Sequence, residues 1–328
     1  MAGPHRRARF RTPGYGCRRG IALVLVLWVL TLLTVMAVGM TAAQRTETAL
    51  TENQIADARF RALADAAIAF AMFSFLMPAP DSVLTASGDG IGDAGPWIPN
   101  GAPRPWRFAG EGVSIAVSNE RSRINLNQAS PELLAALMAA FEVPDDEARS
   151  LADAIADWRD EDDLHLLNGA EDDDYEAAGR TLGAKDAPFT AVEELQQVLG
   201  VSPALYRLLA PELSVDSDGN QIDQSFASPA ALAALQGIPL AEAELQVEER
   251  DNPIVPDAQG PRAVNRGGPL YRIRVNAEGL SGKGRGMEAL VELTAGQQPP
   301  YQVRWRRYGL AGAEPVQGSD EMHRDGAD

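Results

Sequence analysis

The chain has 328 residues, of which 45% are hydrophobic, and a net charge of −17. This ordinary apolar share leaves room for one large or two small globular domains. The first 20 residues hold six arginines and no acid, so the rest of the chain carries −23 and should repel nucleic acid and anionic membrane surfaces. Cys17 is the only cysteine, which excludes a disulfide within the chain.

An uncharged run of 20 residues, 21–40, follows the basic leader. As a helix it is long enough to cross a hydrocarbon core about 30 Å thick. The leader arginines keep their side cytoplasmic under the positive-inside rule, so the acidic body is predicted to lie outside the cytoplasm. A cleaved secretory signal is the alternative, but its apolar core would span only about 7–15 residues. Thr41 to Ala43 is also a mediocre cleavage site.

The helical pattern continues beyond the apolar run. No proline or glycine interrupts residues 40–77, and Pro78 and Pro80 then end the pattern. One continuous helix, 21–77, is therefore predicted to run from the membrane into a globular domain. Its apolar residues recur near one stripe: Leu50, Ile55, Ala58, Leu63, Ala67 and Phe70.

A loop and a set of strands are predicted on either side of a helical region. Residues 78–112 are rich in glycine and proline and predict a loop anchored by Trp97 and Trp106. Alternation of apolar and polar residues predicts strands of an antiparallel sheet with one buried face. These strands are 113–117, 271–275, 287–293 and 301–305, with a hairpin loop over 279–286 and a disordered polar tail after about Gly309.

Residues 124–250 read as short helices with clear start signals. Ser130 and Ser202 each place a capping hydroxyl before a first-turn proline. Thr190 with Glu193 predicts a capping box. A weak internal repeat relates the segment beginning at Ile124 to one beginning 98 residues later at Ile222. This region is predicted to be an all-helical insertion in the sheet.

The leader resembles a known family. Arg18-Arg19-Gly20, followed by the apolar run from Ile21, is similar to the leader of type IV pilins and type II secretion pseudopilins. In that family a prepilin peptidase cuts after the glycine on the cytoplasmic face and methylates the new N-terminus. The resemblance implies that Gly20 and Ile21 are the processing residues.

Leu25 refines the resemblance. Most members of the family carry a glutamate at this fifth mature position, and its absence is typical of the minor pseudopilin K, the general secretion pathway protein K. A carboxylate inside a membrane costs about 2.5–3.5 kcal/mol on insertion scales, so it is expected only where a partner compensates it. A subunit at the filament tip has no neighbour above it to supply that partner.

Two segments of the insertion, 124–137 and 192–211, also resemble helix-hairpin-helix modules. In other proteins such modules grip DNA phosphates. The loop at Gly200 lacks a flanking lysine and the body is acidic, so a structural role is favoured over DNA binding. The same stretches recur in the pseudopilin K family, whose fold is a pilin-like sheet interrupted by a large helical insertion. The predicted fold class is therefore α+β: a long N-terminal transmembrane helix packed on a small antiparallel sheet, with an inserted all-α, helix-hairpin-helix or SAM-like domain.

Two carboxylate runs, 157–163 and 171–174, flank a turn at Gly169. Carboxylates this dense call for a counter-ion in a compact fold, and oxygen-only ligands suit Ca²⁺. The spacing is not that of an EF-hand, and a solvated acidic loop is the alternative. The pseudopilin K family is known to bind calcium through acidic ligands of its helical domain. The resemblance implies the ligands Asp160, Asp163, Glu171, Asp173 and Asp174.

No catalytic or cofactor-binding residues are predicted. The chain has three histidines, no G-x-S-x-G elbow and no H-E-x-x-H motif, and its glycine-rich loops do not follow a strand and open a helix. A membrane-tethered periplasmic hydrolase that uses the carboxylates as a metal site, and a membrane-anchored competence-type DNA-binding protein, remain the alternatives from other classes.

The resemblance to the pseudopilin K family implies a structural minor pseudopilin that initiates or caps the type II secretion pseudopilus at its tip. The expected location is the bacterial inner membrane, with a single pass and a periplasmic body. The expected partners are the other minor pseudopilins of the tip complex, the prepilin peptidase and the inner-membrane secretion platform, and no nucleic acid. The predicted divisions are a leader (1–20), the helix (21–77), a loop with the first strands (78–123), the insertion (124–250), the remaining strands (251–308) and the tail (309–328).

Overall fold

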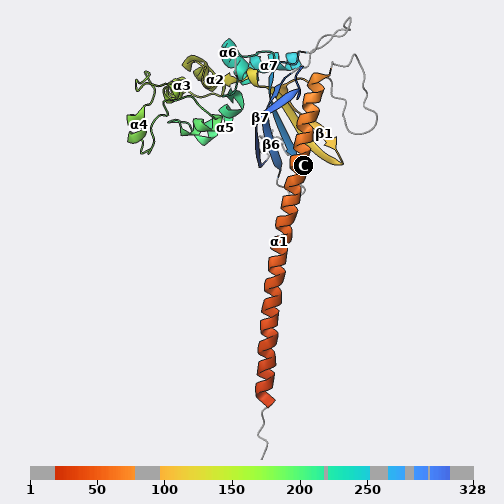
Figure 1. Ribbon diagram of the computed structural model, residues 1–328. Coiled ribbons are helices and arrows are strands. Elements are labelled where there is room, and N and C mark those ends of the chain that lie inside the picture. Colours follow the sequence, from red (N-terminus) through yellow and green to blue (C-terminus); the bar gives the residue numbers. More distant parts are fainter. Residues whose placement is uncertain are drawn as a thin grey trace, which may run out of the picture. The chain divides into compact units, whose positions relative to one another are not determined.

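A computed structural model describes residues 19–77, 97–217, 221–251, 265–277, 284–294 and 296–310 (Figure 1). The chain divides into two compact units, Met1–Arg61 and Ala62–Asp328. The first unit holds most of the long helix α1 (Arg19–Leu76). The second holds the end of that helix, the sheet and the helical insertion.

The predicted long helix is confirmed, because α1 runs without a break for 58 residues. Its segment Ala22–Thr41 has a mean hydropathy of 2.6 and is long and apolar enough to span a membrane. Pro78 and Pro80, the predicted stop signals, lie outside the described residues.

The predicted apolar stripe of α1 is only partly buried. Ala67 is buried, but Leu50 and Ile55 are 57% and 49% exposed. The buried face begins later and follows helical spacing, with small alanines between larger side chains that let the helix approach the sheet closely. These buried residues are Ala64, Ala67, Ile68, Ala71, Met72 and Phe75.

The sheet has five strands in the order β1-β2-β5-β6-β7, and every neighbouring pair is antiparallel. Its strands are β1 (Asn100–Phe108), β2 (Glu111–Asn119), β5 (Leu270–Ala277), β6 (Arg285–Leu293) and β7 (Tyr301–Leu310). The strands predicted at 113–117, 271–275, 287–293 and 301–305 are confirmed, each somewhat longer than predicted. The predicted tail begins too early, because β7 continues to Leu310.

The prediction of a loop through residue 112 is wrong, because β1 occupies part of it. Pro103 and Pro105 lack the N–H that a central strand needs, and this lack made the segment look like a loop. The structure resolves the conflict by placing β1 at an edge of the sheet, where proline is tolerated. A register shift between Asn100 and Pro103 accommodates the first of these prolines.

Aromatic contacts fix the end of α1 to the sheet. The Phe70 ring stacks on Trp106 of β1, with centroids 5.2 Å apart, and meets Trp97 edge-on at 5.7 Å. The Phe75 ring stacks on Tyr271 of β5 at 4.8 Å. Both tryptophans predicted to be anchors therefore contact the helix. Ring pairs of this kind add about 0.5–1.5 kcal/mol beyond the area they bury.

Arg266 closes the C-terminal end of α1. Its Nη1 donates to the carbonyl oxygens of Ser74, Phe75 and Met77 at 2.8, 2.6 and 2.6 Å. The last carbonyls of a helix have no partner inside the helix, and they carry the negative end of the helix dipole. The guanidinium group of Arg266 donates hydrogen bonds to these carbonyls, and its positive charge interacts favourably with the helix dipole.

We expect Arg266→Gln to lower the free energy of unfolding by about 1–2 kcal/mol, because the carbonyls lose a charged donor. Arg266→Lys should lower the free energy of unfolding less, since the positive charge remains. Chemical denaturation of the full chain in a mild detergent measures both, with Arg207→Gln on an exposed helical surface as the control. Equal stability of Arg266→Gln and the wild type would contradict this role.

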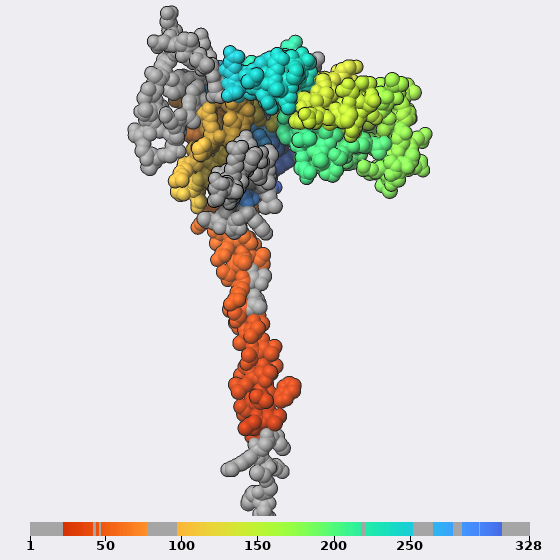
Figure 2. All heavy atoms as spheres, turned by 180° about the vertical axis from the view of Figure 1, so that it is seen from behind, coloured from red at the N-terminus to blue at the C-terminus, as the bar shows by residue number. Residues whose placement is uncertain are grey.

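The insertion between β2 and β5 is mainly helical, but it is not all-α as predicted, because Ile124–Asn125 and Leu213–Ser214 form a short parallel strand pair. Its elements are η1 (Glu120–Ser122), β3 (Ile124–Asn125), α2 (Pro131–Ala140), α3 (Asp145–Arg159), α4 (Asp172–Ala177), η2 (Val192–Gln197), α5 (Pro203–Leu209), η3 (Ala210–Glu212), β4 (Leu213–Ser214), α6 (Pro229–Gln236) and α7 (Leu240–Asp251). Most of its helices share one hydrophobic core that includes Leu134, Ile155 and Leu195, and a smaller cluster packs α6 against α7 through Leu232 and Ala243. Figure 2 shows them as one packed body, coloured from yellow through green to cyan.

Capping residues explain where several of these helices begin. The Ser130 and Ser202 hydroxyls accept from the backbone N–H three residues on, at 3.3 and 3.1 Å, as predicted. Ser228 does the same for α6 at 3.1 Å, so the two arms of the sequence repeat both form Ser-Pro-initiated helices. The Thr190–Glu193 capping box is wrong. The Thr190 N–H bonds to Glu194 instead, because the turn that follows is a 3-10 helix.

Candidate functional site

The apolar segment at the start of α1 carries the first candidate site. Gly20 and Ile21, the predicted processing residues, lie in the first turn of α1. Leu25 follows in the apolar segment and is 61% exposed. The whole of that segment, Ala22–Thr41, offers only apolar or weakly polar side chains to its surroundings. Its threonines return their hydroxyls to backbone carbonyls four residues earlier, as Thr31 does at 2.7 Å.

The insertion leaves the sheet where α1 ends. Asn119, the last residue of β2, pairs with Tyr271 near the start of β5, and every residue of the insertion lies between them in sequence. Tyr271 stacks on Phe75, one residue before the end of α1. The bulk of the helical insertion therefore emerges from the same end of the sheet as the C-terminus of the helix.

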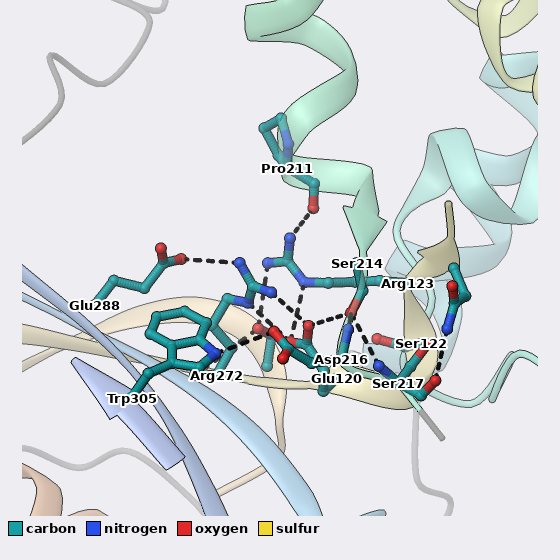
Figure 3. Close-up of polar contacts among 12 residues, drawn as sticks. Glu120, Ser122, Arg123, Pro211, Ser214, Asp216, Ser217, Arg272, Glu288 and Trp305 are labelled. Atoms are coloured by element: carbon teal, nitrogen blue, oxygen red, sulfur yellow. Dashed lines mark hydrogen bonds and ion pairs between the residues drawn. The ribbon is translucent and has the colours of Figure 1, made fainter. Parts of the chain in front are cut away.

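A buried ionic cluster joins the insertion to the sheet (Figure 3). Glu120 of η1 is fully buried and receives two bonds from Arg272 of β5, at 2.8 and 2.5 Å. Ser214 of β4 donates its hydroxyl to the same carboxylate at 2.5 Å. Arg123 lies 3.7 Å from Glu120 and donates to the carbonyl of Pro211. Each side of the junction therefore supplies groups to one carboxylate.

The charges of this cluster compensate one another. Burial raises the pKa of Glu120, but the hydrogen bonds and charge of Arg272, with further help from Arg123 and Ser214, outweigh it and leave the pKa below its usual value. Burial, followed by the charge of Arg272, lowers the pKa of Arg123 to about 10. Glu120 remains ionised at neutral pH, and its carboxylate is shared by the buried guanidinium groups of Arg272 and Arg123. Arg272 also lies 3.5 Å from Glu288 of β6. We call this ionic cluster the joint between the insertion and the sheet.

Trp305 of β7 extends the joint across the same face of the sheet. Its indole N–H donates to Asp216 of the insertion at 3.0 Å. The guanidinium carbons of Arg272 and Arg307 lie 5.2 and 4.7 Å from its ring centroid. Arg307 also pairs with Glu193 of η2. Cation–π contacts and ion pairs thus connect the sheet to the insertion at several points.

The second candidate site is the acidic region after α3. Asp157, the helix residue at its base, is fully buried and accepts from the N–H of Leu166 at 3.2 Å. Gly169 packs directly against this carboxylate, and a Cβ at that position would collide with it. Gly183 packs in the same way against Asp172. These two glycines let the acidic segments approach one another closely.

Several carboxylates in this region lack hydrogen-bond partners for buried oxygens. Asp160, Glu171 and Asp186 each have one such oxygen. Burial, followed by the charges of Asp157, Asp160 and Asp186, raises the pKa of Glu171 to about 7. Burial and neighbouring acids also raise the pKa values of Asp160 and Asp186. Unpaired, mutually repelling carboxylate oxygens are the donor set that a hard cation such as Ca²⁺ satisfies.

The structure places only some of the predicted calcium ligands in one cluster. Asp160 and Glu171 belong to the cluster of interacting carboxylates, whereas Asp163 and Asp173 are exposed. Asp174 accepts from the N–H of Glu171 at 3.1 Å and lies 3.3 Å from His165 Nδ1. Within the described ranges, no three or more His, Cys, Asp or Glu side chains are arranged to hold a metal ion. The calcium site stays a prediction.

Sequence reasoning missed two members of the cluster, Asp157 and Asp186. Asp157 belongs to the first carboxylate run but was not among the predicted calcium ligands. Asp186 lies outside both runs, and only the fold brings it to the cluster. Its backbone has a positive φ of 53°. The one signal for Asp157 was its position on the apolar face of a helix, where an aspartate needs partners.

Comparison with known proteins agrees with this architecture. The family model for the type II secretion system protein K matches residues 115–217, which cover β2 and much of the insertion. Over this region the chain is similar to the type II secretion system protein K family. A type II secretion system protein K of Klebsiella pneumoniae is 27% identical over 71% of this chain and 73% of its own length. That of Pseudomonas aeruginosa is 26% identical over 71% and 72%. The family role is that of a minor pseudopilin, which fits a single-pass inner-membrane protein.

One further sequence match and one solved structure are also similar to this chain. The protein K of Dickeya chrysanthemi is 34% identical over 32% of this chain, a match that spans only 28% of that relative. The crystal structure of the GspK–GspI–GspJ complex from the enterotoxigenic Escherichia coli type 2 secretion system contains a chain with the same fold. The TM-score is 0.55 at 19% identity, over 79% of this chain and 99% of that one. The predicted α+β fold class is confirmed.

Proposed function

We propose that this chain is a structural subunit at the tip of the type II secretion pseudopilus, where it initiates or caps assembly. The observation that carries the proposal is the position of the insertion. Because it leaves the sheet at the C-terminal end of α1, it occupies the place where a further pilin-like subunit would have to stack. Leu25 supports the same position, since a tip subunit needs no carboxylate for a neighbour above it.

The partners proposed for the tip are two other minor pseudopilins, like those that accompany protein K in the Escherichia coli complex. Exposed apolar residues of α1, among them Leu50, Ile55 and Phe73, offer a surface for their helices. Co-expression and affinity purification test this, and the expected result is a complex of the three chains. Capture of major pseudopilin alone, with no minor pseudopilin bound, would contradict a tip position.

Processing after Gly20 is the most direct prediction of the function. Co-expression with a prepilin peptidase should shorten the chain by its first 20 residues and leave a methylated Ile21, as measured by mass spectrometry. Gly20→Val should abolish cleavage, because the prepilin peptidase of the family cuts after a glycine. Gly39→Val is the matched control, since a Cβ at Gly39 would meet nothing within 4 Å. Cleavage after Ala43 instead would refute the pseudopilin assignment.

Calcium is proposed as the counter-ion of the acidic region. Asp160 and Glu171, together with Asp157 and Asp186, supply carboxylate oxygens that would hold it, and Asp163, Asp173 and Asp174 lie on the adjoining segments. The unpaired buried oxygens of Asp160, Glu171 and Asp186 support this proposal. A bound cation would neutralise the repulsion among these groups and tie the loop after α3 to α4. The body of the protein, including this region, is proposed to lie in the periplasm.

A further inference from the structure

Three leucines near the acidic region are unusually exposed. Leu164 and Leu167, on the loop after α3, are 75% and 95% exposed, and Leu182, beyond α4, is 75% exposed. We call these three residues the leucine surface. Single exposed leucines are common, but a group of them on neighbouring segments is a feature of interaction sites.

The loop that carries two of them is held in place by its backbone. The N–H of Leu166 donates to buried Asp157 at 3.2 Å. The N–H and the side-chain amide of Asn168 both donate to Asp153 of α3, at 3.2 and 3.0 Å. Ser150 donates its hydroxyl to the carbonyl of Asn168 at 2.9 Å. The leucines are thus presented to solvent by a loop that several hydrogen bonds hold to α3.

Leu182 belongs to the same neighbourhood. The adjacent Gly183 packs against Asp172 at the start of α4. Asp163, next to Leu164 in sequence, acts electrostatically on Asp186, as does Asp172. Figure 1 shows α4 at the end of the helical insertion opposite the strands, so the core of the insertion does not cover this region.

A strongly negative rim borders Leu164 and Leu167, whereas Leu182 lies between Arg180 and Lys185 in sequence. Residues 160–176 contain nine Asp and Glu residues and no lysine or arginine. This charge repels nucleic acid, anionic lipid and a second copy of the acidic body of this chain. It attracts lysine and arginine side chains, which would be placed beside any apolar group that the leucines bury.

We propose that the leucine surface is a docking site for a segment of another protein that is both basic and apolar, with aliphatic side chains flanked by lysine or arginine. The leucines supply the apolar contact and the carboxylate rim selects the charge. This binding site is separate from assembly through α1 and goes beyond the tip role proposed above. It requires neither processing nor pseudopilus formation, so its test is independent of theirs.

The test measures binding of a labelled synthetic peptide to the full chain in zwitterionic micelles by fluorescence anisotropy. The probe is a short lysine–leucine peptide with its leucines on one helical face, and the control peptide has serine in place of each leucine. The variant is L164S/L167S/L182S, which removes exposed side chains and leaves every charge intact. The control variant L208S/L245S removes two leucines that are 47% and 67% exposed elsewhere. All samples contain the same concentration of micelles, so partitioning of the peptide into micelles is the same for every variant.

The expected result is binding of the lysine–leucine peptide that weakens at least tenfold in L164S/L167S/L182S and is unchanged in L208S/L245S. The serine peptide should bind at least tenfold more weakly than the leucine peptide to the wild type. Equal binding by the triple variant would show attraction by charge alone and overturn the proposal, as would no binding to the wild type. Self-association of the full chain that the triple variant abolishes would also overturn it, because the occupant would then be a second copy. Thermal melts verify that the variants remain folded.

Discussion

Glu120→Ala is expected to lower the free energy of unfolding by about 3–5 kcal/mol, because it removes the fully buried carboxylate that Arg272 and Arg123 share. Arg272 then keeps only the more distant and partly exposed Glu288. Glu120 is fully buried, and Arg272 and Arg123 are 6% and 8% exposed, so water cannot replace the lost partner. The Ser214 hydroxyl also loses its acceptor. Urea denaturation of the full chain in a mild detergent measures the change.

Two companion variants make this prediction specific to the joint. Removal of both charges in E120L/R272M should cost less than Glu120→Ala, since a buried pair can be replaced by apolar groups more cheaply than one member can be removed. Asp145→Asn is the surface control, because Asp145 is 82% exposed and its ion pair with Arg149 should contribute little. An unchanged denaturation midpoint for Glu120→Ala would show that the joint does not stabilise the fold.

The joint also has a defined pH dependence. Its carboxylate has a lowered pKa in the folded state, so it contributes stability that is present above the ordinary value of 4.5 and is lost as the pH falls below it. Stability of the wild type should therefore fall on acidification below about pH 4.5 more steeply than that of Glu120→Ala.

Local patterns made much of the fold predictable. Hydropathy and the absence of proline and glycine defined α1, and two-residue alternation defined β2, β5, β6 and β7. The Ser-Pro pairs marked the starts of α2 and α5 because the capping bond forms within one turn. Each of these signals depends on residues close together in sequence.

The contacts that organise the molecule could not be predicted in this way. Glu120 and Arg272 are 152 residues apart, and nothing in either neighbourhood indicates the other. β1 was missed because its prolines are compatible only with an edge strand, and edge position is a property of the whole sheet. Asp186 joined the acidic cluster for the same reason, since tertiary packing brought it to Asp160 and Glu171. The predicted ligands Asp163 and Asp173 are exposed, and the sequence did not show this because burial depends on the fold.

The acidic region should make stability depend on both pH and calcium. Glu171 has a folded-state pKa of about 7, against an ordinary value of 4.5. A raised carboxyl pKa means that the folded protein binds the proton more tightly than the unfolded chain. The resulting stability is full below about pH 4.5 and is lost as the pH rises through 7. Asp157, Asp160 and Asp186 act in the same direction.

In a chelator, we therefore expect the melting temperature of the full chain to fall between pH 5 and pH 8. Saturating Ca²⁺ should reverse the fall, because the cation replaces the protons as the counter-charge. At about a thousand times its dissociation constant, a bound ligand stabilises by about 4 kcal/mol, which for a domain of this size corresponds to about 10 °C. The calcium effect should be small at pH 5, where protons compete, and Mg²⁺ should substitute poorly because it demands a stricter geometry.

Glu171→Gln should flatten the pH dependence in chelator and weaken the calcium response, since it removes the most perturbed carboxylate. Glu176→Gln is the matched control, an exposed residue on the same short helix, and should leave both unchanged. Identical melting curves at pH 8 with calcium and with chelator would favour a solvated acidic loop. A flat pH profile for the wild type would also argue against the buried, unpaired carboxylates as its source. Because the loop between α3 and α4 carries Leu164 and Leu167, a calcium-dependent stabilisation would also fix the segment that presents them.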